Sequence, residues 1–184
     1  PRLEDFYEGR QEAEALYDNL GKILAHLPKK GVTYDPCIFP WYQVSLAPSQ
    51  VICQMALTAY VLQDEEKITW CGERLKDVTT DGYGAYRSRL INLLLYEPSN
   101  ARQREILIGY VGNAEEMTSN KAFQLVKRLK LEDGDFALIE DMLRFKRSTL
   151  RKQLIDLLMT REDEGLKASL GRLLADKKEE KRTA

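Results

Sequence analysis

The chain has 184 residues, of which 43% are apolar and 31% are charged, and its formal net charge is −1. This apolar fraction can form a sizeable core, which excludes wholesale disorder, and no uninterrupted apolar stretch of about 18 residues is present to span a membrane. The near-neutral charge excludes a strongly basic nucleic-acid binder, although it leaves room for a local basic patch.

The first predicted element is a long amphipathic helix over about residues 3–27, whose apolar residues recur at spacings of three and four. Pro28 ends this helix, and prolines recur through residues 28–48, where we expect an ordered loop. The loop contains Phe39, Trp41 and Tyr42. These aromatic residues either pack onto neighbouring helices or form a hot spot for a protein partner.

Ser49 is the predicted N-cap of the next helix, which runs to about Asp64, and a further helix follows over residues 65–76. From there helical patterns alternate with short breaks, over residues 83–97, 100–112, 119–131, 135–145, 148–160 and 163–175, and another pattern begins at 178. The chain starts at Pro1 without a methionine and closes in this last helical pattern. We therefore expect a fragment of a longer protein.

One pattern occurs three times: three apolar residues on one helical face, followed eight residues later by an arginine. The copies are Leu90, Leu93, Leu94 with Arg102; Ile139, Met142, Leu143 with Arg151; and Leu170, Leu173, Leu174 with Arg182. The step between the first two arginines is longer than the step between the last two and has room for one extra helix. A helical pair of this kind cannot bury its apolar stripe alone, so it stacks on the next pair.

This pattern resembles the HEAT family of repeats, in which an arginine near the start of the second helix joins a polar ladder along the stack. Arg102, Arg151 and Arg182 match that position. The resemblance implies an all-α fold, an α-solenoid built as a right-handed superhelical stack of helical hairpins, over residues 83–184. The chain is also similar to the helical arrays of large, poorly characterised bacterial proteins of the molybdate-metabolism-regulator type.

Residues 1–82 show no clear copy of the repeat, and we interpret them as diverged repeats or an end cap that continues into residues 83–184 as one domain. The only histidine is His26, and the three cysteines, Cys37, Cys53 and Cys71, lie far apart. This set cannot assemble a local zinc site, and scattered thiols fit a reducing, cytoplasmic compartment. Cys53 and Cys71 lie on apolar helix faces, where we expect each to pack as a small apolar residue. No nucleotide-binding or nucleophile motif is present, so we predict no catalytic residue, cofactor or metal.

Basic residues gather between 121 and 152, and the candidates for binding nucleic acid or an acidic partner are Lys127, Lys130, Arg144, Arg147 and Arg151. Consecutive repeats could align such residues in a stripe that follows a phosphate backbone. The other interpretation is a solvated helix face, with Arg151 taken up by the repeat ladder.

We expect a non-catalytic scaffold that binds a protein or another domain of its parent chain, by analogy with curved helical arrays. The alternative is a nucleic-acid-binding array. HEAT-like arrays that excise damaged bases make an enzyme a third hypothesis.

Overall fold

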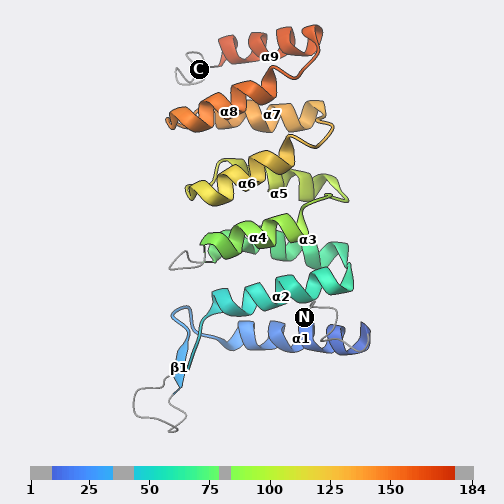
Figure 1. The fold of residues 1–184 in the computed structure, drawn as a ribbon, viewed down its shortest axis with the longest axis vertical. Helices are drawn as coiled ribbons and strands as arrows, with labels where there is room; N and C mark the ends of the chain where they lie inside the picture. The colour runs from blue at the N-terminus through green and yellow to red at the C-terminus, as the bar shows by residue number, and fades with distance from the viewer. Residues whose placement is uncertain (1–9, 35–43, 79–83, 177–184) are drawn as a thin grey trace. The chain divides into compact units, whose positions relative to one another are not determined.

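The computed structural model describes residues 10–34, 44–78 and 84–176, and these contain nine α-helices and one short β-hairpin (Figure 1). The contacts of the chain divide it into two compact units, Pro1–Leu94 and Leu95–Ala184, which we call unit 1 and unit 2. No helix in the described ranges is both long enough and apolar enough to cross a membrane. The prediction of a mainly helical chain is confirmed.

Unit 1 is organised around α2 (Pro48–Leu62), which packs against α1 (Arg10–His26), α3 (Glu65–Arg74) and α4 (Gly84–Leu94). A single 3-10 turn, η2 (Leu75–Asp77), follows α3. The core of unit 1 consists of fully buried side chains from these elements, among them Ala56, Ala59, Cys71, Leu75 and Ile91.

The described part of the predicted loop over residues 28–48 holds a β-hairpin rather than an irregular segment. Strand β1 (Val32–Tyr34) pairs antiparallel with β2 (Val44–Leu46). Gly31 precedes β1 with a φ of 74°, and its N–H donates to the carbonyl of Pro28 over 2.7 Å. A glycine suits this turn because residues with a Cβ are strained at positive φ.

The start of α2 differs from the prediction that Ser49 caps it. The N-cap residue is Ala47, two residues earlier, and Pro48 is the first residue of the helix. The Gln50 side chain accepts a hydrogen bond from the Ala47 N–H over 2.8 Å. Proline is suited to the first turn because its missing N–H would have no helical partner there. The residue that marks the start of this helix in the sequence is therefore Pro48 rather than Ser49.

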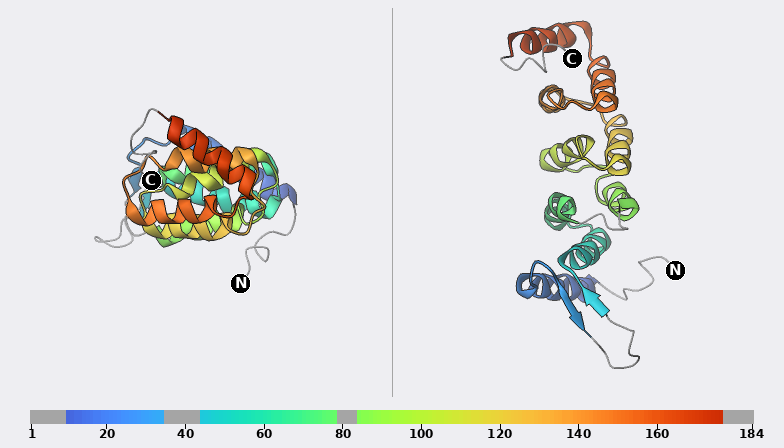
Figure 2. Two further views of the ribbon diagram at one scale, coloured as in Figure 1. Left: turned by 90° about the horizontal axis from the view of Figure 1, so that it is seen from above. Right: turned by 90° about the vertical axis from the view of Figure 1, so that its left-hand side faces the viewer.

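Unit 2 consists of α5 (Ala101–Val111), α6 (Glu116–Val126), α7 (Asp133–Met142), α8 (Ser148–Leu158) and α9 (Asp163–Ala175). Within this unit α5 packs against α6 and α7, and α7 packs against α8 and α9. The right-hand view of Figure 2 shows the consequence: α5 and α7 lie in one row and α6 and α8 in a second row.

The helix boundaries follow a different spacing from the one that the apolar pattern predicts. Helices α4, α6 and α8 each have 11 residues and start at Gly84, Glu116 and Ser148, so that equal intervals separate their starts. The same interval separates the starts of α5 and α7, at Ala101 and Asp133. Residues at the seventh and eleventh positions of α4, α6 and α8 are buried in all three helices: Leu90 and Leu94, Ala122 and Val126, Leu154 and Leu158.

This register corrects the predicted equivalence of Arg102 and Arg151. Arg102 lies in the first turn of α5, whereas Arg151 lies in the first turn of α8, which is a helix of the other row. The Arg102 guanidinium pairs with Glu105 on its own helix, and Arg151 Nε donates to the carbonyl of Phe145 over 2.9 Å. Arg182 lies outside the described residues. The predicted step from Arg102 to Arg151 therefore joined helices that are not counterparts.

Candidate functional site

A pocket of about 1030 Å³ in unit 2 opens among α6, α7, α8 and α9. We call it the unit-2 groove. Side chains of Phe123, Phe136 and Leu157 give it an apolar floor. Each of these three residues is buried and therefore belongs to the packed core as well as to the groove.

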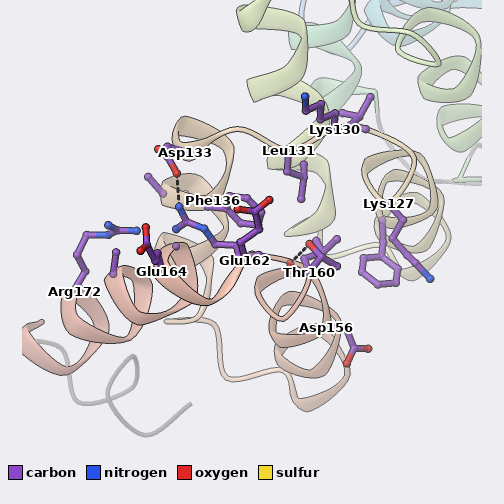
Figure 3. A pocket seen from close by; sticks show the side chains of 17 residues that line it. Lys127, Lys130, Leu131, Asp133, Phe136, Asp156, Thr160, Glu162, Glu164 and Arg172 are labelled. Atoms are coloured by element: carbon purple, nitrogen blue, oxygen red, sulfur yellow. Dashed lines mark hydrogen bonds and ion pairs between the residues drawn. The ribbon is translucent and has the colours of Figure 1, made fainter.

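Charged residues of both signs surround this floor. The cations are Lys127, Lys130, Arg161 and Arg172, and the acids are Asp133, Asp156, Glu162 and Glu164. Figure 3 shows Lys127 and Asp156 at one end of the groove and Glu164 and Arg172 at the other, with Phe136 between them. The groove therefore carries mixed charge rather than charge of one sign.

Arg161 anchors the wall of the groove between α7 and α9. Its side chain is only 7% exposed, and its guanidinium pairs with Asp133 and donates to Ser169 Oγ over 2.7 Å. The same guanidinium lies 4.4 Å from the centre of the Phe136 ring, within cation–π range. One arginine in the loop before α9 thus contacts both α7 and α9.

Glu140 of α7 extends this network of polar contacts to Arg172 of α9. Its carboxylate accepts hydrogen bonds from Ser169 Oγ over 2.6 Å and from Arg172 Nε over 2.9 Å. Burial alone raises the pKa of Glu140, but the hydrogen bonds from Arg172 and Ser169 outweigh it and hold that pKa below its ordinary value. The hydrogen bond to Glu140 correspondingly raises the pKa of Arg172. We call Asp133, Glu140, Arg161, Ser169 and Arg172 the α7–α9 polar cluster.

Two of the predicted basic residues, Lys127 and Lys130, line the groove. Both are exposed, and Lys127 Nζ lies 5.6 Å from the centre of the Phe123 ring. The backbone at Lys130 is fixed from α5, because its carbonyl accepts a hydrogen bond from the Arg104 guanidinium over 2.8 Å. That guanidinium also pairs with Asp135 at the start of α7.

The other predicted basic residues do not line the groove. The Arg147 guanidinium, at the start of α8, donates to the carbonyl of Asn113 over 2.8 Å and so ties α8 to the loop before α6. Arg151 bonds the carbonyl of Phe145, and Arg144 is an exposed residue whose guanidinium lies 5.5 Å from the Phe145 ring. The structure therefore uses Arg147 and Arg151 to hold loops together within unit 2.

The described thiols are poor nucleophiles. Cys53 and Cys71 are 5% and 0% exposed, as their positions on apolar helix faces predict. Burial raises the pKa of each thiol to about 11, so both are protonated at neutral pH. The Cys71 sulfur lies 3.8 Å from the hydroxyl oxygen of Tyr17.

Several candidates fall outside the described residues, namely Cys37 and the aromatic residues Phe39, Trp41 and Tyr42. Among the residues that the structure describes, no group of three or more histidine, cysteine, aspartate and glutamate side chains is placed to hold a metal ion.

Sequence reasoning missed the α7–α9 polar cluster. Nothing in the sequence joined Glu140 to Arg161 or Arg172. A weak signal exists in retrospect, since Glu140 interrupts the apolar face of α7 one residue after Ile139. A charge in an apolar face indicates a buried partner of opposite sign, because an unpaired buried charge is costly.

Comparison with known protein families, curated proteins and solved structures identifies a family but no characterised relative. A model described as a family of unknown function, DUF5724, matches residues 2–184, which is nearly the whole chain. No curated protein and no solved structure matches this chain.

Proposed function

The chain belongs to the DUF5724 family of unknown function, and from its helical packing and its groove we propose that it is a non-catalytic helical-repeat scaffold. In this proposal the unit-2 groove binds a protein or another domain of the parent chain. The repeat architecture is an α-solenoid, a superhelical stack of helical pairs like that of the HEAT family.

The equal intervals between helix starts support the architecture. Helices α4, α6 and α8 share their length and their two buried positions, which is the regularity expected of a repeat. In unit 2 the contacts of α7 with α5, α8 and α9 are those of a helix inside a repeat array. Such arrays bury their apolar stripes only by stacking and use their grooves for binding.

The mixed charge of the unit-2 groove is the observation that supports the proposed role most directly. Four cations and four acids surround one apolar floor. A phosphate backbone would be repelled by Asp156, Glu162 and Glu164, whereas a folded protein surface offers both signs and apolar side chains. Mixed charge favours selection of one partner over others, because each misplaced like-charge pair lowers affinity.

Site-specific photo-crosslinking tests this role. A photoreactive phenylalanine analogue replaces Ala168, which lines the groove, and in a matched control replaces Ala101, which is exposed on α5 and does not line it. In cells that produce the protein, we expect one defined polypeptide adduct at 168 and none at 101, identified by mass spectrometry.

The charge exchange Lys130→Glu with Glu162→Lys sharpens that experiment, since it keeps the net charge and replaces two exposed groove residues. We expect it to abolish the adduct while the circular dichroism spectrum stays unchanged. An adduct that is equal at both positions, or that survives the exchange, contradicts binding in the groove.

The nucleic-acid alternative retains one observation in its favour: Lys127 and Lys130 are both exposed and both line the groove. Fluorescence anisotropy with short single- and double-stranded DNA and RNA, from low to physiological salt, tests it. Micromolar binding that weakens steeply with salt and is lost in Lys127→Glu/Lys130→Glu supports this alternative. These two lysines are better probes than Arg147 and Arg151, whose guanidinium groups hold loops in place.

A further inference from the structure

Helix α9 presents large apolar side chains to solvent. Leu170 is 50% exposed and Leu174 is 69% exposed, and Ser169 is the one fully buried residue among those of α9. Its inner side is held to α7 by the α7–α9 polar cluster. The outer side therefore carries the apolar residues that a helix inside an array would bury.

The repeat register shows which residues these are. The N-cap residues of α5, α7 and α9 are Asn100, Glu132 and Glu162, and counting from them aligns the three helices. The counterparts of Leu170 are then Ile108 in α5 and Glu140 in α7, which are 0% and 6% exposed. Position 170 is buried in the two earlier helices of this row.

A second position gives the same result. The counterparts of Leu173 are Val111 and Leu143, which are 0% and 1% exposed, whereas Leu173 itself is half-buried. Val111 is the last residue of α5, and Leu143 directly follows α7. Both helices pack against a partner in the second row, α6 and α8 respectively. Compared with α5 and α7, α9 therefore lacks two neighbouring helices among the described residues, one from each row.

The side chain at position 170 decides what kind of pair fits. Glu140 meets α9 through Ser169 and Arg172, which are polar partners. Leu170 is apolar like Ile108, whose helix α5 packs against α6 and α7. The sequence from Lys177 to Ala184 contains no large apolar residue and cannot supply this cover itself.

We propose that the outer face of α9, formed by Leu170, Leu173 and Leu174, docks an amphipathic helical pair with the apolar pattern of α6 and α7. The inference rests on the repeat architecture proposed above, but it concerns a different surface from the unit-2 groove. The two can therefore fail separately.

A graft tests the proposal in register. In the full chain, residues from 177 onward are replaced by a copy of residues 115–144, because residue 115 lies at the same distance from the N-cap of α5 as residue 177 lies from the N-cap of α9. We expect amide hydrogen exchange in α9 to slow at least about tenfold, while exchange in α1 and α2 stays unchanged.

The control graft carries Leu125→Asp and Val126→Asp in the copied segment, which correspond to two buried positions of α6. It should leave exchange in α9 at the level of the ungrafted chain. Equal protection by both grafts, or by neither, overturns the proposal.

A second copy of the chain is the competing occupant, and sedimentation of the ungrafted protein decides that case. A dimer that Leu170→Glu/Leu174→Glu converts to a monomer overturns the proposal in favour of self-association. A monomer at all concentrations, together with slowed exchange in the first graft, supports docking of a helical pair.

Discussion

Helices α7 and α9 are counterparts in the proposed repeat and are stabilised in different ways. Helix α7 has packed neighbours in α5, α8 and α9, and its Ile139 is completely buried. The counterpart of Ile139 in α9 is Ser169, which bonds Glu140 instead of filling an apolar layer. A repeat position therefore does not create a core by itself, because the neighbours on both sides must supply the apolar contacts.

The largest effect should come from truncating buried apolar side chains in α5 and α7. Ile139→Ala and its counterpart Leu107→Ala each remove a fully buried side chain. We expect either to lower the free energy of unfolding by about 2–5 kcal/mol, measured by urea denaturation. A loss below about 1 kcal/mol in both variants would contradict the assignment of these positions to the core.

Removing the charge of Glu140 should have a smaller effect that is confined to α9. Glu140→Gln leaves the Arg161 and Arg172 guanidinium groups facing a neutral amide. We expect a loss of about 1–3 kcal/mol, seen as faster amide exchange in α9 but not in α6. Glu164→Gln, which changes an exposed acid in the first turn of α9, serves as the control and should leave exchange unchanged.

Acid should weaken the same link. Because the pKa of Glu140 is held below its ordinary value, the unfolded chain binds a proton more readily than the folded one. Its contribution is present above the ordinary glutamate pKa of about 4.3 and is lost as the pH falls through the lowered value. We expect the stability difference between the natural chain and Glu140→Gln to shrink over this range. A difference that stays constant would show that Glu140 does not titrate with folding.

The smallest effect should come from the uncovered face of α9. Leu170→Ala changes a side chain that is already half exposed, so we expect unfolding to change by less than about 0.5 kcal/mol. Calorimetry of this variant beside Ile139→Ala gives the sharpest comparison of the two helices. A loss as large as that of Ile139→Ala would mean that Leu170 already has a cover in this chain.

The sequence predicted the later helices closely. The predicted spans 148–160 and 163–175 correspond to α8 and α9, and 100–112 corresponds to α5. These predictions rested on the spacing of apolar residues, because each helix must present one continuous apolar face to its neighbours. Helix α6 begins three residues before its predicted start, because its first turn, from Glu116 to Thr118, carries a weaker apolar signal.

The sequence by itself determined the mainly helical class, the apolar helix faces and the burial of Cys53 and Cys71. These properties follow from residue type and local spacing. Only the tertiary structure decided which helices are counterparts in the repeat and that Arg147 bonds the loop before α6. It also decided that cations and acids from α7, α8, α9 and the loops before α7 and α9 share one groove. Each of these depends on which helices become neighbours, and local spacing constrains the face of a helix but not the identity of the helix packed against it.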